Sequence, residues 1–268
     1  MSTVRPAAVA GMFYDDNPDR LRRDVTGFLC GAAGAELHRR TAPKAIIAPH
    51  AGYPYSGAVA GRAYATVKPL GRRIKRVVLL GPAHRLYVRG IAASTAGAFA
   101  TPLGEVPVDQ ATIRDLAGEL GFLVYSDEAH AMEHSLEVHL PFLQAIFEEI
   151  SLLPFVVGDA APSQVEVLLD RLWGGDETLI IVSSDLSHYR SYEAAREIDA
   201  FSTEQIRLLA PEKLTGEHAC GYLPIGGLLR AAARRHLSCE VLDTCSSGDT
   251  AGPRVRVVGY GAYVFYGA

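Results

Sequence analysis

The sequence has no apolar stretch close to the ~20 residues that a membrane-spanning helix needs. Its start, MSTVRPAAVAGMFYDD, lacks the long apolar core of a signal peptide. The four cysteines (Cys30, Cys220, Cys239 and Cys245) show no CxxC spacing, which argues against a disulfide framework or a zinc ribbon. The net charge of −4 and the short, scattered basic clusters argue against nucleic acid or membrane as a partner. We therefore expect a cytoplasmic protein.

The chain also has no repeat, low-complexity tract or linker, so nothing divides its 268 residues. Its hydrophobic content of 49% is ample for a core. Helical and strand patterns interleave along the whole length, which favours one α/β domain over residues 1–268. We expect a mostly parallel or mixed sheet with helices on both faces. The expected helices are 55–67, 109–120, 139–150, 163–173, 192–209 and 225–236, and later strands are 152–157, 239–243 and 255–266.

Three apolar runs each end in a short polar loop that carries a histidine. The runs and their histidines are 45–48 with His50, 77–81 with His84, and 179–183 with His188. Apolar runs in which polar residues do not alternate with apolar ones are typical of strands buried on both faces of a parallel sheet. Ligands bind beyond the carboxyl ends of such strands. Three imidazoles at one edge of the sheet therefore predict a metal or acid–base site.

The first two histidine loops resemble each other, and His50 and His84 form a natural pair of metal ligands. Imidazole nitrogens suit iron, zinc, copper or nickel. Tyr53 and Tyr55 follow His50 and are candidates to contact a planar substrate.

The third loop differs, because His188 lies several residues beyond its strand and Asp185 is near enough in sequence to orient it. We expect His188 to act as a general acid or base, with Asp185 beside it. The alternative is that Asp185 caps a helix.

The segment from Asp127 to His139 is the densest patch of titratable groups. It contains no HExxH motif, so a zinc protease is disfavoured. Glu133, His134 and His139 are candidates for the wall of a substrate pocket, although a solvated start of a helix is the alternative.

A third metal ligand is expected from the loop after residues 239–243, which offers a thiol, a carboxylate and hydroxyl groups. The motif that begins at Cys220 and Gly221 opens a helix. We expect it to be a packing turn, with Cys220 buried and inert.

These motifs together resemble the Memo family, specifically its prokaryotic branch known as AmmeMemoRadiSam system protein B. The matching strings are Arg5-Pro6, Ala10–Tyr14, Pro49–Tyr53, Gly81–His84, Glu133–Pro141, Ser183–His188, Cys220-Gly221, Pro224–Gly226, Ser247–Asp249 and Val258–Tyr260. They run the length of the chain in order.

The resemblance implies a fold similar to that of class III extradiol dioxygenases, which cleave catechol-like rings with non-haem Fe(II). It makes His50 and His84 the metal histidines and His188 the catalytic histidine. The resemblance also implies a third ligand in the loop before the final strand, where animal Memo proteins use a cysteine and the ring-cleaving dioxygenases use a carboxylate. Thr250 stands at the position of that cysteine here. We therefore favour the adjacent Asp249 as the third ligand, with Cys245 as the alternative.

The leading hypothesis is an Fe(II)-dependent, oxygenase-like enzyme that acts on a small aromatic or phenolic compound. Copper or zinc are the other candidate metals. A carboxylate ligand favours ring cleavage with O₂, whereas a thiolate favours a redox or copper/iron-binding role. The alternatives are a non-enzymatic, metal-bearing module that binds a peptide or partner protein, and a metal hydrolase. The sequence leaves the oligomeric state open.

Overall fold

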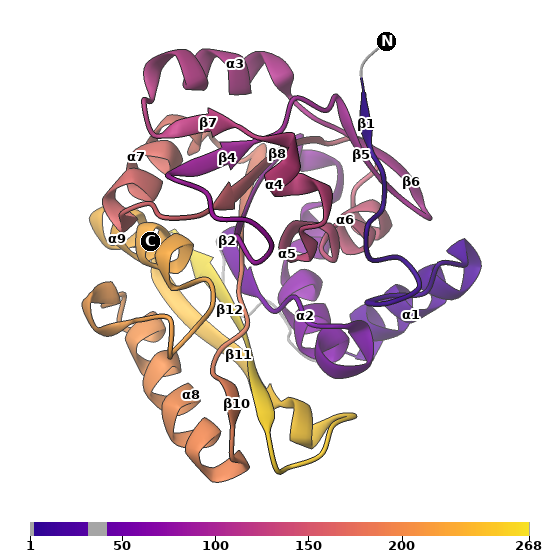
Figure 1. The fold of residues 1–268 in the computed structure, drawn as a ribbon, viewed down its shortest axis with the longest axis vertical. Coiled ribbons are helices and arrows are strands. Elements are labelled where there is room, and N and C mark those ends of the chain that lie inside the picture. The colour runs from indigo at the N-terminus through magenta and orange to yellow at the C-terminus, as the bar shows by residue number, and fades with distance from the viewer. Residues whose placement is uncertain (1–2, 32–41, 268) are drawn as a thin grey trace.

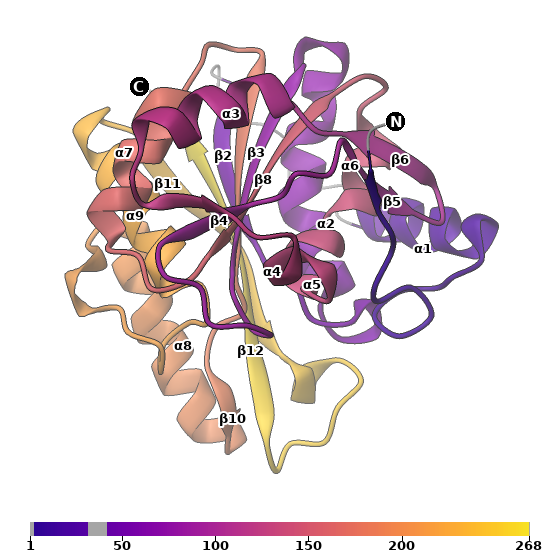
Figure 2. The same cartoon turned by 45° about the horizontal axis from the view of Figure 1, so that its top comes forward.

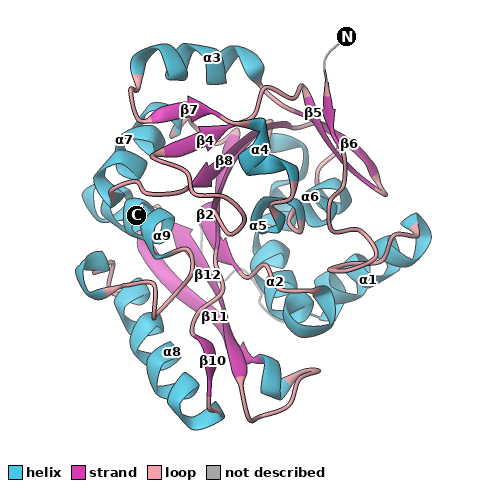
Figure 3. Ribbon diagram, in the orientation of Figure 1, coloured by secondary structure: helices cyan, strands magenta, loops and turns pink. Residues whose placement is uncertain are grey.

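The computed structural model describes residues 3–31 and 42–267. Within these residues the chain forms a nine-stranded mixed sheet and a separate three-stranded sheet, with helices packed around them (Figures 1 and 3). This architecture confirms the predicted α/β fold. None of the helices in this part of the chain is long and apolar enough to cross a bilayer.

The strands are β1 (Val4–Arg5), β2 (Pro43–Ala48), β3 (Arg76–Pro82), β4 (Ile91–Ala93), β5 (Ala98–Thr101), β6 (Gly104–Pro107), β7 (Leu123–Tyr125), β8 (Ser151–Val157), β9 (Thr178–Ser183), β10 (His188–Arg190), β11 (Ser238–Ser246) and β12 (Val257–Tyr266). The α-helices are α1 (Pro18–Gly31), α2 (Tyr53–Val67), α3 (Gln110–Glu119), α4 (Asp127–Ala131), α5 (His134–Glu137), α6 (Leu140–Ile146), α7 (Pro162–Leu172), α8 (Tyr192–Arg207) and α9 (Tyr222–Arg234). Short 3₁₀ helices are η1 (Lys68–Arg73), η2 (Pro211–Lys213) and η3 (Ser247–Asp249).

The large sheet has the order β10-β12-β2-β9-β3-β8-β4-β7, and β11 pairs with β12 outside this path. Its centre is parallel, because β2 and β3 flank β9 in the same direction and β8 follows β3. Every residue of β9 is buried, as expected for a β-branched run covered on both faces. The carboxyl ends of β2, β9 and β3 therefore lie side by side at one edge.

Helices cover both faces of the large sheet. Helices α1 and α2 lie on one side, and α7, α8 and α9 lie on the other, as Figures 1 and 2 both show. The small residues of α2 permit close packing against α1. A Cβ atom at Gly61 would lie 2.7 Å from the carbonyl oxygen of Phe28, so only glycine fits there.

The N-terminal segment (residues 3–17) is tied to the body of the protein by a buried carboxylate. Glu137 accepts hydrogen bonds from the Arg5 guanidinium, from the amides of Ala8 and Val9, and from the Tyr14 hydroxyl. Buried carboxylates are tolerated when their lone pairs are filled in this way. The segment that follows β1 is therefore held in a fixed position.

Several elements differ from the expected boundaries. The helix expected over 139–150 ends at Ile146, because Phe147 adopts an extended conformation before β8. Helix α7 is not opened by a Ser163 cap; instead the Gln164 side chain accepts a hydrogen bond from the Ala161 amide. Strand β11 continues to Ser246, so Cys245 lies on a strand and not in a loop.

Candidate metal centre

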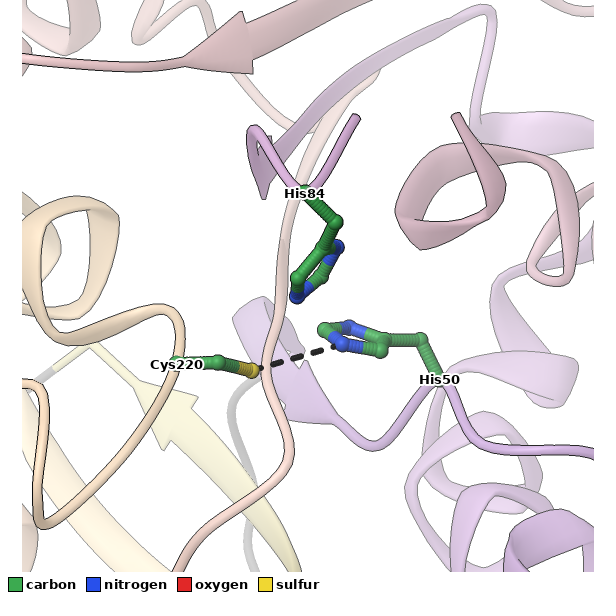
Figure 4. Close-up of side chains that lie close together, drawn as sticks. All are labelled: His50, His84 and Cys220. Atoms are coloured by element: carbon green, nitrogen blue, oxygen red, sulfur yellow. Dashed lines mark hydrogen bonds between the residues drawn. The ribbon is translucent and has the colours of Figure 1, made fainter. Parts of the chain in front are cut away.

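His50 and His84 follow β2 and β3, and the structure brings their rings together at the carboxyl edge of the sheet. Their ring centroids lie 5.0 Å apart. Cys220, which comes just before α9, reaches the same point from the other side of the sheet (Figure 4). The three residues can each offer one ligand atom, and these atoms all lie within 4.8 Å of one another.

The hydrogen bonds of His50 fix which ring nitrogen is free. Ser183 Oγ donates to the Ser135 carbonyl at 2.6 Å, so it can only accept from His50 Nδ1, also at 2.6 Å. His50 Nε2 therefore carries the lone pair. Burial and the neighbouring imidazoles lower the pKa of His50 well below its usual value, which keeps the ring neutral.

Glu133 fixes which ring nitrogen of His84 is free. Its carboxylate accepts from the His84 amide at 2.6 Å, from His84 Nδ1 at 3.0 Å and from the Ser135 amide at 2.9 Å. Burial alone would raise the pKa of Glu133, but these interactions outweigh it and lower the pKa to about 2. The ionised carboxylate holds the proton on Nδ1 and leaves His84 Nε2 free. A carboxylate behind a ligating histidine is a recurrent feature of metal sites.

The thiol of Cys220 completes this group. Its Sγ lies 3.3 Å from His50 Nε2 (Figure 4), and burial raises its pKa to about 12. The neighbouring glycine makes this approach feasible, since a Cβ atom at Gly221 would lie 2.7 Å from the Ser183 carbonyl oxygen. The structure therefore places Cys220, which was expected to be buried and inert in a packing turn, in contact with His50.

The donor set fits a transition-metal ion. Bonds of about 2.0 Å to nitrogen and about 2.3 Å to sulfur, at tetrahedral angles, separate the two donor atoms by about 3.5 Å. The observed 3.3 Å between His50 Nε2 and Cys220 Sγ is close to that value. Imidazole nitrogens and a cysteine sulfur suit zinc, copper and iron, and metal binding would require the thiol proton to leave.

His84, Glu133 and His134 form a second cluster that satisfies the same distance limit. Glu133 already accepts three N–H groups there, so it orients His84 and has little capacity left for a cation. The His134 ring stacks on His84 with centroids 4.7 Å apart and packs against Phe13 at the same separation. His134 thus forms part of the wall around the three candidate ligands.

Asp185 and His188 lie on the same side of the site but do not hydrogen bond to each other. Asp185 Oδ1 accepts from the His50 amide at 2.8 Å, so this carboxylate supports the first histidine loop. Burial raises the pKa of Asp185 to about 6 despite the opposing effect of His188. His188 Nδ1 donates to the Leu186 carbonyl at 2.8 Å, so Nε2 is the ring nitrogen left to accept a proton.

A cavity of about 680 Å³ opens onto the three candidate ligands. Its lining includes Phe13 from the N-terminal segment, Tyr55 from the start of α2, and His188 from β10. It also includes Tyr260 and Arg256 from β12 and the loop before it. This volume is within the range of small-molecule sites.

Other predicted residues lie outside this cavity. Tyr53 is buried and donates its hydroxyl hydrogen to the Val138 carbonyl. His139 is buried against Tyr64, whose hydroxyl lies 2.9 Å from His139 Nδ1. Neither side chain lines the cavity.

The structure also keeps the two expected third ligands away from the histidine pair. Asp249 closes a local turn, where it accepts from the Ser246 amide and hydroxyl and from the Tyr192 hydroxyl. Cys245 and Asp249 line a different hollow, beside α8. Thr250 Oγ1 donates to the Ser247 carbonyl. The loop before β12 therefore contributes to the cavity wall, but Cys220 and not Asp249 lies beside His50.

Sequence reasoning missed Cys220 because its loop arrives from the opposite side of the sheet. The available signal was the glycine that follows it. Gly221 permits the chain to touch the end of β9, where the second and third histidine motifs also converge.

Comparison with known proteins supports the resemblance seen in the motifs. Residues 5–264 match the family of Memo-like proteins. MEMO1 family proteins of Metallosphaera sedula and of Saccharolobus islandicus strain Y.G.57.14 are each 32% identical, over 96% of this chain and 97% of the relative. The crystal structure of the uncharacterized protein JW3007 from Escherichia coli K12 has a TM-score of 0.53 and covers 82% of this chain and 99% of its own. At 14% identity, that likeness concerns the fold alone. The chain therefore belongs to the Memo family.

Proposed function

We propose that this protein is a metal-dependent oxidoreductase that acts on a small phenolic compound. His50, His84 and Cys220 are its proposed ligands. The observation that carries this proposal is that two oriented imidazole nitrogens and a thiol converge at a cavity of about 680 Å³.

The number of donors favours catalysis over a purely structural role. Structural sites usually have four protein ligands, whereas catalytic sites keep a position open for substrate or water. Three donors next to a cavity leave room for a phenolic oxygen. The thiolate favours the redox-active metals, Fe(II) or copper, and a bound ion of this kind would supply electron-transfer chemistry to the substrate.

The residues around the donors suit a phenolic substrate. Phe13, Tyr55 and Tyr260 supply aromatic surface to the cavity. His188, with Nε2 free to accept, is the proposed base that takes the phenolic proton. Asp185 keeps the His50 backbone in place.

Metal analysis of protein purified without oxygen tests the ligand set. After dialysis against a chelator, His50→Ala, His84→Ala and Cys220→Ala should each lose most of the metal that the parent protein retains. Cys245→Ala and His218→Ala are matched controls outside the cavity and should retain it. Full metal retention by Cys220→Ala would show that the thiol is not a ligand.

A screen of oxygen uptake over catechols and aminophenols tests the reaction. The metal-loaded parent protein should consume O₂ with at least one of them. His188→Ala should keep its metal and turn over more slowly. Activity that persists without O₂, with zinc as the bound metal, would instead favour the hydrolase alternative.

A further inference from the structure

Among the described residues, the lining of the cavity includes one strongly basic side chain, and no described acidic residue pairs with it. Arg256 is the only arginine or lysine among the described residues that line it. Two neighbouring arginines are paired with acids: Arg254 with Asp249 at 3.4 Å, and Arg190 with Glu217 at 3.1 Å. Within residues 3–31 and 42–267, the guanidinium of Arg256 makes no hydrogen bond or ion pair.

An irregularity in β10 positions Arg256. The pairing of β10 with β12 shifts register between His188 and Arg190, and Tyr189 between them has a φ of 57°. Consecutive residues of a regular strand point to opposite faces, but His188 and Tyr189 both line the cavity. A left-handed conformation is costly for a tyrosine and persists only when its surroundings hold it.

Tyr189 in turn supports the arginine. The Arg256 guanidinium lies over the Tyr189 ring, with Cζ 5.4 Å from the centroid. The Tyr189 and His188 rings are in edge contact, with centroids 5.7 Å apart. The bulge at Tyr189 therefore brings the proposed base, His188, and the Arg256 guanidinium into the same cavity.

We propose that Arg256 is an anion-binding residue, so that the substrate is an aromatic compound carrying a carboxylate as well as a phenolic hydroxyl. This inference rests on the proposed function. A guanidinium matches the planar fork of a carboxylate, and a single arginine balances a single negative charge. Among the described residues, Asp185 supplies the only carboxylate that lines the cavity, and it already accepts from the His50 amide.

Binding measured by calorimetry to anaerobic, metal-loaded protein tests this inference. The probes are 3,4-dihydroxyphenylacetate, which carries a carboxylate, and 4-methylcatechol, which does not. The parent protein should prefer the first roughly fivefold, as expected for one partly exposed charge-assisted contact. Arg256→Gln should lose this preference by binding the acid more weakly while its affinity for 4-methylcatechol stays the same. Arg254→Gln is the matched control and should behave like the parent protein.

The outcomes separate this inference from the proposed function. Equal affinity of the parent protein for both catechols, or an unchanged preference in Arg256→Gln, overturns the role of Arg256 and leaves the proposed function standing. Binding of neither catechol refutes the proposed function. Phenylacetate, which has the carboxylate but no hydroxyl groups, then tests Arg256 alone in a ligand-observed NMR titration. Weaker phenylacetate binding in Arg256→Gln supports the subsite, and equal or absent binding overturns it.

Discussion

The hydrogen bond between Glu133 and His84 allows a sharp test of how the proposed metal centre is organised. Glu133 accepts three N–H groups, two of them from His84. Glutamine at this position has nearly the same shape, but one of its two terminal groups is a donor. In Glu133→Gln, at least one N–H would therefore face another N–H.

We expect this substitution to weaken metal binding without removing a ligand. Loss of an orienting partner behind a ligating histidine typically costs 10- to 100-fold in affinity, which corresponds to about 1.4–2.7 kcal/mol. The affinity is measured by anaerobic titration with Co²⁺ in competition with a chelator, using the absorption of the bound ion.

Asp127→Asn is the control for the general effect of neutralising a hydrogen-bonded carboxylate. Asp127 also accepts from three donors, the Ser94 hydroxyl and the Thr95 amide and hydroxyl, and it does not line the cavity. Its variant should bind Co²⁺ like the parent protein. An affinity of Glu133→Gln within twofold of the parent value would refute the orienting role of Glu133.

Two further predictions concern stability. Gly61→Ala should lower the melting temperature, because its Cβ would lie 2.7 Å from the Phe28 carbonyl oxygen. Gly27→Ala in α1 places its Cβ more than 4 Å from any other group and should raise the free energy of unfolding by roughly 0.5–1 kcal/mol. Equal shifts of the two melting temperatures would contradict the close packing of α1 on α2. Burial lowers the pKa of His139 to about 3 and that of His130 to about 4, both below the usual 6.5. The unfolded chain therefore binds more protons below pH 6.5, and the free energy of unfolding should fall between pH 6.5 and pH 4 by up to ~1.4 kcal/mol per pH unit for each histidine. In urea titrations, the free energy of unfolding of His139→Gln should fall less steeply with decreasing pH than that of the parent protein. An identical dependence on pH would show that His139 does not contribute to it.

The sequence predicted the part of the site that depends on strand direction. Apolar runs ending in His50 and His84 lie on neighbouring parts of a parallel sheet, and the common direction of those strands brings the two rings together. The α/β fold followed from the same periodicity. Local patterns of this kind are visible along the chain, because each strand and its histidine are adjacent in sequence.

The remaining features depend on contacts between distant segments. Cys220 meets His50 across 170 residues, a relation that no local spacing reveals. The family resemblance pointed to Asp249 as the third ligand, but its carboxylate accepts from Ser246 and Tyr192. The bulge at Tyr189 arises from pairing with β12, so the sequence of β10 alone gave no indication that His188 and Tyr189 share a cavity.

The position of β12 beside β2 has a consequence for how the protein matures in a cell. The final strand is inserted next to one of the earliest, so the sheet is completed only after synthesis reaches Tyr266. His50 emerges from the ribosome long before Cys220, so the two can meet only after most of the chain has been made. A half-made chain thus exposes its imidazoles without the thiol. The proposed ligand set is therefore assembled late in biogenesis.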